Sequence, residues 1–143
     1  MNTNTLKSIG AALAGIFAGA ALPTATDVLL RAAGIFPSFN VNEPMSNPLL
    51  LLATAYRTVY GVLGAYITAR LAPNRPMGHA LVLGAIGLAA SVVGAVVTWN
   101  MGPAFGPHWY PLALVALAMP QSWLGGKLRV MQLGGRNRVA ELT

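Results

Sequence analysis

LVLGAIGLAASVVGAVVTW, residues 81–99, is a run of nineteen residues without one charged side chain. About 20 consecutive apolar residues are enough for an α-helix to cross the hydrocarbon core of a bilayer. Further apolar stretches precede and follow this run, and the four stretches cover residues 6–36, 48–72, 76–99 and 109–126. The sequence therefore predicts an all-α fold, a four-helix transmembrane bundle whose successive helices form antiparallel up-down hairpins.

The predicted helices divide the chain into one membrane domain and a short tail. Residues 1–130 are expected to form a single four-span domain, and residues 131–143 a basic cytoplasmic tail. We expect the fourth helix to end at the pair Gly125-Gly126, because glycine is common where helices stop. The start of the first stretch, with Lys7 and the small residues 18–20, also fits a cleavable secretory signal. The apolar pattern continues to Ile35, which favours a membrane span.

Composition narrows the classes of function. The chain has 143 residues, of which 55% are hydrophobic and 8% charged, and its net charge is +6. A soluble domain carries about 25% charged residues. The chain has no cysteine, which excludes thiolate chemistry and cysteine-based metal sites. His79 and His108 fall at opposite ends of the predicted bundle, so we expect no metal site and no cofactor.

The distribution of positive charge predicts how the bundle is inserted. Seven of the nine Lys and Arg residues lie near the N-terminus, between the second and third stretches, or near the C-terminus. Cytoplasmic connections carry an excess of Lys and Arg. We therefore expect a multi-pass protein of the bacterial inner (plasma) membrane with both termini cytoplasmic and residues 38–47 and 101–108 outside. The cations should contact anionic lipid headgroups at the cytoplasmic face, and no nucleic-acid partner is expected.

Small residues recur at spacings of three and four along the first three stretches. Membrane helices associate through such residues because lipid tails are as apolar as leucine. We expect these faces to form the bundle interior, and the alternative is an interface with a second copy or with a membrane protein partner. The glycines expected at close helix contacts are Gly15, Gly19, Gly61, Gly64, Gly84, Gly87 and Gly94.

Asp27, Arg31 and Arg57 are the ionisable residues well inside apolar stretches. A charge at such depth costs about 2.5–3.5 kcal/mol and marks a pairing or a function. Asp27 and Arg57 should lie about 12 Å and about 14 Å below the outer ends of their helices. We therefore predict an Asp27–Arg57 ion pair between the first two helices, with Arg31 as a second partner of Asp27. Tyr56 and Tyr60 flank Arg57 and can add hydroxyl donors.

The sequence offers two hypotheses of function. One is a non-catalytic accessory or assembly protein in which the Asp27–Arg57 pair fixes helix register. The alternative is a small transporter, or a protein that binds an anionic lipid or solute, because one carboxylate facing two guanidiniums leaves a positive site. Proton coupling through Asp27 is a further option, which a nearby arginine would hinder. No nucleophile–base pair or phosphate loop is present, so we do not expect an enzyme.

Three segments resemble small uncharacterised bacterial inner-membrane proteins with four transmembrane helices. They are residues 26–31 (TDVLLR), 56–61 (YRTVYG) and 68–73 (TARLAP). This resemblance implies a four-span fold and no particular activity. The chain is also similar in size to small multidrug-resistance exporters, which have a membrane carboxylate in the first span. It differs from them because its membrane carboxylate is an aspartate, Asp27, and not a glutamate, and is predicted to pair with arginines. The concentration of its Lys and Arg residues on one side also opposes the antiparallel dimer of dual topology that such exporters form.

Overall fold

Long helices make up most of the chain. The computed structural model describes residues 1–40 and 42–143. Residue 41, in the connection predicted to face outside, is not among the described residues. The elements are, in chain order, α1 (Thr3–Ala32), α2 (Asn47–Leu71), α3 (Pro76–Thr98), a short 3₁₀ helix η1 (Pro103–Phe105) and α4 (Trp109–Leu142). Among these, α1, α2 and α3 are long and apolar enough to cross a membrane.

The ends of the first helices follow the local sequence signals. Asn2 caps α1, since its side-chain oxygen accepts a hydrogen bond of 3.3 Å from the backbone N–H of Asn4. Gly34 has a φ of +74°, a conformation that favours glycine, and the N–H of Ile35 donates back to the carbonyl of Leu30. Pro48 lies in the first turn of α2, where its missing N–H leaves no helical hydrogen bond unmade.

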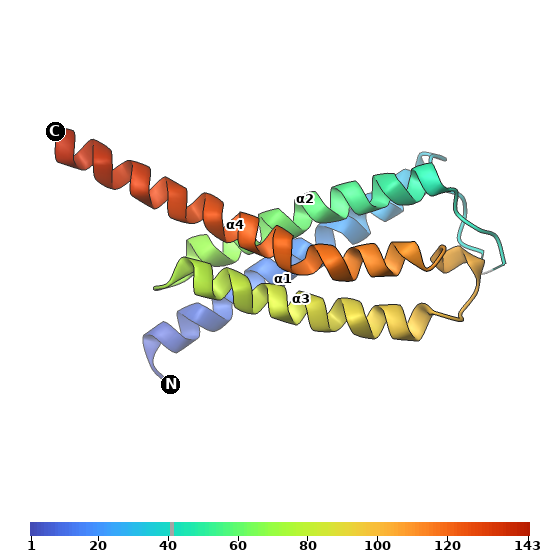
Figure 1. Ribbon diagram of the computed structural model, residues 1–143, viewed down its shortest axis with the longest axis horizontal. Helices are drawn as coiled ribbons and strands as arrows, with labels where there is room; N and C mark the ends of the chain where they lie inside the picture. Colours follow the sequence, from blue (N-terminus) through green and yellow to red (C-terminus); the bar gives the residue numbers. More distant parts are fainter. Residues whose placement is uncertain (41) are drawn as a thin grey trace.

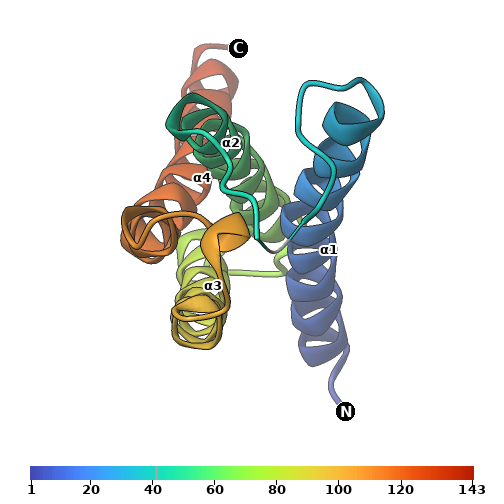
Figure 2. The ribbon, with the colours of Figure 1, turned by 90° about the vertical axis from the view of Figure 1, so that its right-hand side faces the viewer.

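The helices do not form a closed ring of four. α2 packs against α1 on one side and against α4 on the other, and α3 packs mainly along α4, whereas α1 and α3 meet over only a short length (Figures 1 and 2). Figure 1 shows residues 33–40, 42–46 and 99–108, which connect the long helices, at one end of the molecule, here called the loop end. Both termini and the turn 72–75 lie at the other end, here called the terminal end.

The prediction that the last helix ends at Gly125-Gly126 is wrong, because α4 continues to Leu142. Both glycines are buried where α4 crosses its neighbours. A Cβ atom on Gly125 would lie 2.4 Å from the carbonyl oxygen of Val62, and one on Gly126 would lie 2.8 Å from the Cβ of Ala80. These glycines therefore serve close approach to α2 and α3. Beyond them α4 projects away from the bundle and includes all of the segment predicted as a basic tail except its last residue (Figure 1).

The interior is built from small side chains. Its central cluster consists of Ala65, Ala69, Ala80 and Leu83. Thr68 is fully buried beside it and donates a hydrogen bond of 3.1 Å to the carbonyl oxygen of Ala11. Most large apolar side chains instead lie on the outside, for example Phe17, which is 73% exposed. Small residues inside and large apolar residues outside are the arrangement that suits a bundle surrounded by lipid tails.

The closest approach between α1 and α2 is at Gly15 and Gly64. A Cβ atom on Gly15 would lie 1.8 Å from Oγ1 of Thr68 and 2.6 Å from the carbonyl oxygen of Gly64. Gly61 and Gly84 are also close-packed, against Gln121 and Ser122 of α4. The backbone of Gly19 lies close to Gly64, although a Cβ on Gly19 itself would meet nothing within 4 Å.

Gly87 and Gly94 were expected at close helix contacts, and the structure places them differently. A Cβ atom on either residue would meet nothing within 4 Å. Both lie on α3 toward the loop end, where α1 and α3 have separated. At these positions the absence of a side chain leaves space between helices instead of bringing two backbones together.

We expect Gly15→Ala to lower the free energy of unfolding by about 1–3 kcal/mol, because the added methyl group overpacks the α1–α2 contact. Gly10→Ala is the matched control in the same helix, since a Cβ there meets nothing within 4 Å. It should be neutral or stabilising by up to about 1 kcal/mol. Reversible denaturation of the purified protein in mild detergent measures both. Equal stability of the two variants would contradict the close contact at Gly15.

Candidate anion site at the loop end

Asp27 on α1 and Arg57 on α2 form the predicted ion pair. Nη2 of Arg57 donates to Oδ2 of Asp27. The two side chains keep 32% (Arg57) and 24% (Asp27) of their surface exposed, so the pair is not sealed inside the bundle. The prediction that an acid of the first helix and a base of the second meet at the same level is confirmed.

The two tyrosines that flank Arg57 have different partners. The Tyr56 hydroxyl donates to Oδ1 of Asp27, and the Arg57 guanidinium lies 5.9 Å from the centre of the Tyr56 ring. The Tyr60 hydroxyl instead shares a hydrogen bond of 3.0 Å with Oγ1 of Thr26. Both carboxylate oxygens of Asp27 are therefore occupied by groups of α2, and Tyr60 adds a second polar link between the same two helices.

Arg31 does not become the second partner of Asp27, which corrects the sequence-based prediction. Among the described residues, Asp27 forms a salt bridge with Arg57 alone. Arg31 donates a hydrogen bond of 2.7 Å to the carbonyl oxygen of Pro37, and its guanidinium lies 5.7 Å from the centre of the Phe39 ring. The chain reverses at Gly34 and brings this carbonyl over the end of α1, while Asp27 has no oxygen left unbound.

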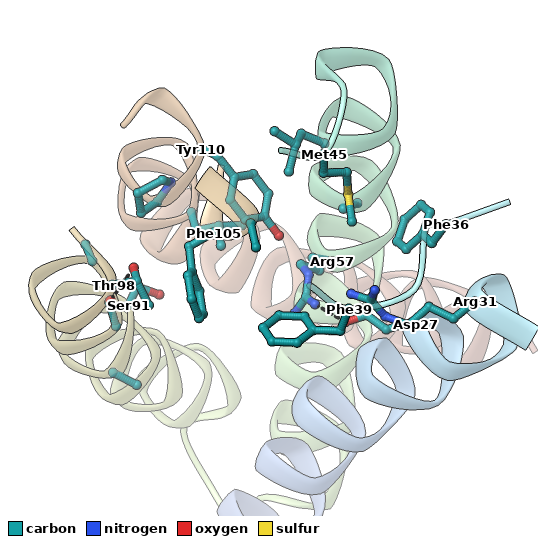
Figure 3. Close-up of a pocket in the computed structure, with 18 residues that line it drawn as sticks. Asp27, Arg31, Phe36, Phe39, Met45, Arg57, Ser91, Thr98, Phe105 and Tyr110 are labelled. Carbon is teal, nitrogen blue, oxygen red and sulfur yellow. Dashed lines mark hydrogen bonds and ion pairs between the residues drawn. The ribbon is translucent and has the colours of Figure 1, made fainter. Parts of the chain in front are cut away.

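A cavity of about 510 Å³ lies beside the ion pair. All four long helices contribute to its wall, together with η1 and the connection between α1 and α2. Figure 3 shows the labelled side chains gathered around it, with the Tyr110 hydroxyl pointing toward Arg57. The polar and charged residues of the wall are Asp27, Arg31, Arg57, Ser91, Thr98 and Tyr110.

Aromatic side chains from both connections lie at the loop end of this cavity. Phe39 follows α1 and Phe105 belongs to η1, and their ring centres are 5.9 Å apart in an edge-to-face arrangement. Both rings line the cavity, as does the buried side chain of Phe36. The two loop-end connections therefore contact each other through these two rings at the wall of the cavity.

The cavity has a positive formal charge. One carboxylate and two guanidiniums in its wall leave a net charge of +1. Within the described residues, Nε of Arg57 is buried and has no hydrogen-bond acceptor. A buried donor without a partner costs about 1–3 kcal/mol. The site can therefore accept an anionic group that balances the extra charge and receives hydrogen bonds from guanidinium and hydroxyl donors.

Sequence reasoning missed several residues of the wall. It singled out neither Tyr110 nor the hydroxyl residues Ser91 and Thr98 of α3 as candidate site residues. All three line the cavity. Ser91 and Thr98 are seven residues apart, so they share one face of α3 with Gly94, and this face lies at the level of the charged pair. The sequence feature that could have predicted a polar site here is the pair of hydroxyl side chains on the same helix face as Gly94.

The histidines do not add to this site. His79 lies near the terminal end, where its Nε2 atom is 2.9 Å from Oγ of Ser8. His108 lies at the loop end and stacks on Trp99, with 3.9 Å between the ring centres. In residues 1–40 and 42–143, no three His, Asp or Glu side chains gather closely enough to hold a metal ion.

Comparison with known proteins does not extend this description. No protein-family model matches the chain, and neither does any curated protein or solved structure. The resemblance to small bacterial inner-membrane proteins therefore stays a prediction.

We expect Asp27→Asn and Arg57→Gln each to lower the free energy of unfolding by roughly 2 kcal/mol, less than for a fully buried pair because these side chains are partly exposed. The double variant should cost clearly less than the sum of the two, with a coupling energy of about 1 kcal/mol or more. The control is Arg31→Gln combined with Asp27→Asn, for which the two changes in the free energy of unfolding should add. Denaturation in detergent gives all the values, and additivity for Asp27 and Arg57 would contradict a stabilising pair.

Proposed function

We propose that this chain is an integral protein of the bacterial inner membrane that binds a small anionic group in the loop-end cavity and is not an enzyme. The observation that carries the proposal is the position of the Asp27–Arg57 pair, which forms part of the wall of a cavity of about 510 Å³ with a net charge of +1. A pair that acted only as a structural link would be better served by complete packing, because nearby space lets water weaken the attraction.

The proposed topology has four antiparallel spans with both termini in the cytoplasm. The first part of α4 packs along α3 and α2 and begins at the loop end beside their ends, which supports a fourth crossing. The terminal end carries the basic residues, including Arg70 and Arg129, on the side where anionic lipid headgroups would meet them. Tyr66 and Gln132 connect these arginines through hydrogen bonds of 2.8–3.3 Å.

A second candidate function is a non-catalytic accessory or assembly protein in which the ion pair only fixes the register of α1 and α2. One observation favours it: both carboxylate oxygens of Asp27 are bonded within the chain. A buried pair can be retained for specificity of packing. This candidate leaves the positively charged cavity without a role, so we place it second.

The two candidates respond differently to a charge exchange. Asp27→Arg combined with Arg57→Asp keeps the net charge and the possibility of a pair. In neutral nanodiscs, we expect sn-glycerol 3-phosphate to stabilise the wild-type protein, and we expect the exchanged protein to fold but to lose this stabilisation. Arg57→Gln should lose about tenfold or more in affinity, since hydrogen bonds to charged groups contribute about 1.5–3 kcal/mol.

The measurement is the melting temperature at increasing concentrations of sn-glycerol 3-phosphate, with glycerol as the uncharged comparison. Arg136→Gln removes a cation at the terminal end and should leave the response unchanged. A wild-type protein that responds equally to both compounds, or an exchanged protein that keeps the full response, would favour the accessory candidate.

The topology can be tested directly because the chain has no cysteine. Single variants Ser38→Cys and Gly102→Cys place a thiol in the two loop-end connections, and Thr143→Cys places one at the C-terminus. In intact spheroplasts, we expect a membrane-impermeant maleimide to label the first two and to leave the third unlabelled until the membrane is opened. Labelling of Thr143→Cys in intact spheroplasts would overturn the proposed insertion.

A further inference from the structure

A second, smaller hollow lies nearer the middle of the bundle than the cavity. It has a volume of about 240 Å³ and lies between α1 and α3, over α2 and α4. Ala90 lines both hollows. From Ala90 to Leu83, at the far end of this crevice, α3 advances by about 10 Å.

Glycines line the crevice where α1 and α3 separate, and their missing side chains leave its space unfilled. Gly19 of α1 and Gly87 of α3 both line it, and a Cβ on either would meet nothing within 4 Å. α1 and α3 come together only near the terminal end, around Gly15 and Leu83. Figure 2, viewed from the loop end, shows the two helices standing apart there.

The crevice opens sideways, toward the region that lipid would occupy. On the α1 side its rim includes Ile16, which is 38% exposed, and on the α3 side it includes Ile86, which is 46% exposed. Ala20 and Ala90, one on each helix, are exposed as well. An alkyl chain can therefore enter between α1 and α3 from the bilayer without passing the phenylalanines at the loop end.

The cavity is polar and the crevice is apolar, which matches the polar headgroup and the apolar acyl chains of a lipid. The cavity toward the loop end holds three charged side chains and three hydroxyl groups. The crevice below it is apolar except for Gln121 and Ser122, and the Ser122 hydroxyl already donates to the carbonyl oxygen of Ala118 at 3.0 Å. A lipid of the loop-end leaflet has its headgroup toward that end and its chains toward the middle of the membrane.

We infer that the anionic group in the cavity is the headgroup of a phospholipid, one of whose acyl chains lies in the crevice between α1 and α3. This inference rests on the proposed function and names its ligand. The headgroup supplies the negative charge that the cavity lacks. The acyl chain gains little free energy by moving from the surrounding lipid into the crevice, because both environments are apolar. The role of the crevice is to let the headgroup reach Arg57 while the acyl chain stays out of water.

The experiment uses phosphatidylcholine nanodiscs that contain a small fraction of phosphatidic acid with a photoreactive group near the end of one acyl chain. Illumination should attach this lipid mainly to crevice residues of α1 and α3. Gly87→Leu fills the crevice and should reduce crosslinking about tenfold. Ala89→Leu is the matched control on an exposed face of the same helix that lines neither hollow, and it should leave crosslinking unchanged.

A headgroup probe separates the inference from the proposed function. Gly87→Leu should keep the wild-type response to sn-glycerol 3-phosphate, because the leucine fills the crevice and leaves the cavity open. Equal crosslinking of Gly87→Leu and Ala89→Leu, or crosslinks spread evenly around the bundle, would overturn the lipid inference and leave anion binding standing. The lipid inference and the proposed function both fail if sn-glycerol 3-phosphate does not stabilise the wild-type protein and the protein does not prefer phosphatidic acid over phosphatidylcholine. A photoreactive phosphatidylcholine that competes equally would identify ordinary surrounding lipid and also overturn the inference.

Discussion

The attachment of α1 to α2 determines most of the structure. α1 is held at two levels, by the backbone contact of Gly15 with Gly64 and by the ion pair of Asp27 with Arg57. These levels are twelve residues, or about 18 Å, apart. Because both contacts are made with α2, nothing draws α1 toward α3 at the loop end. The space that results is the cavity and the crevice below it.

The lipid environment explains how so open an arrangement can be stable. In water, a hollow between helices and a surface rich in large apolar side chains would favour collapse. In a bilayer, lipid tails are as apolar as leucine, so neither feature is penalised in that way. Stability has to come from close contacts and from hydrogen bonds in a poorly hydrated setting. The bond from the buried Thr68 to the carbonyl of Ala11 is of this kind.

The charged pair could be predicted from the sequence because depth and cost restrict the alternatives. Few ionisable residues fall inside apolar stretches, and Asp27 and Arg57 lie at matching distances from the same end of the bundle. The position of Arg31 could not be predicted in this way. Helical spacing places it one turn from Asp27, but its partner, the carbonyl of Pro37, is brought over α1 only by the reversal of the chain at Gly34. The contribution of Tyr110 likewise depends on how α4 packs beside α2.

The glycines show why a motif of small residues does not define an interface. Gly15 and Gly87 both belong to series of small residues at spacings of three and four, so the sequence predicts the same role for both. At Gly15 the missing side chain admits another backbone, whereas at Gly87 nothing approaches and the missing side chain leaves space. The same composition thus produces a close contact where a neighbouring helix is held and a hollow where it is not. What decides between them is how α1 is held: its contacts with α2 are at both Gly15 and Asp27, whereas its contacts with α3, such as that of Ser8 with His79, lie nearer the terminal end.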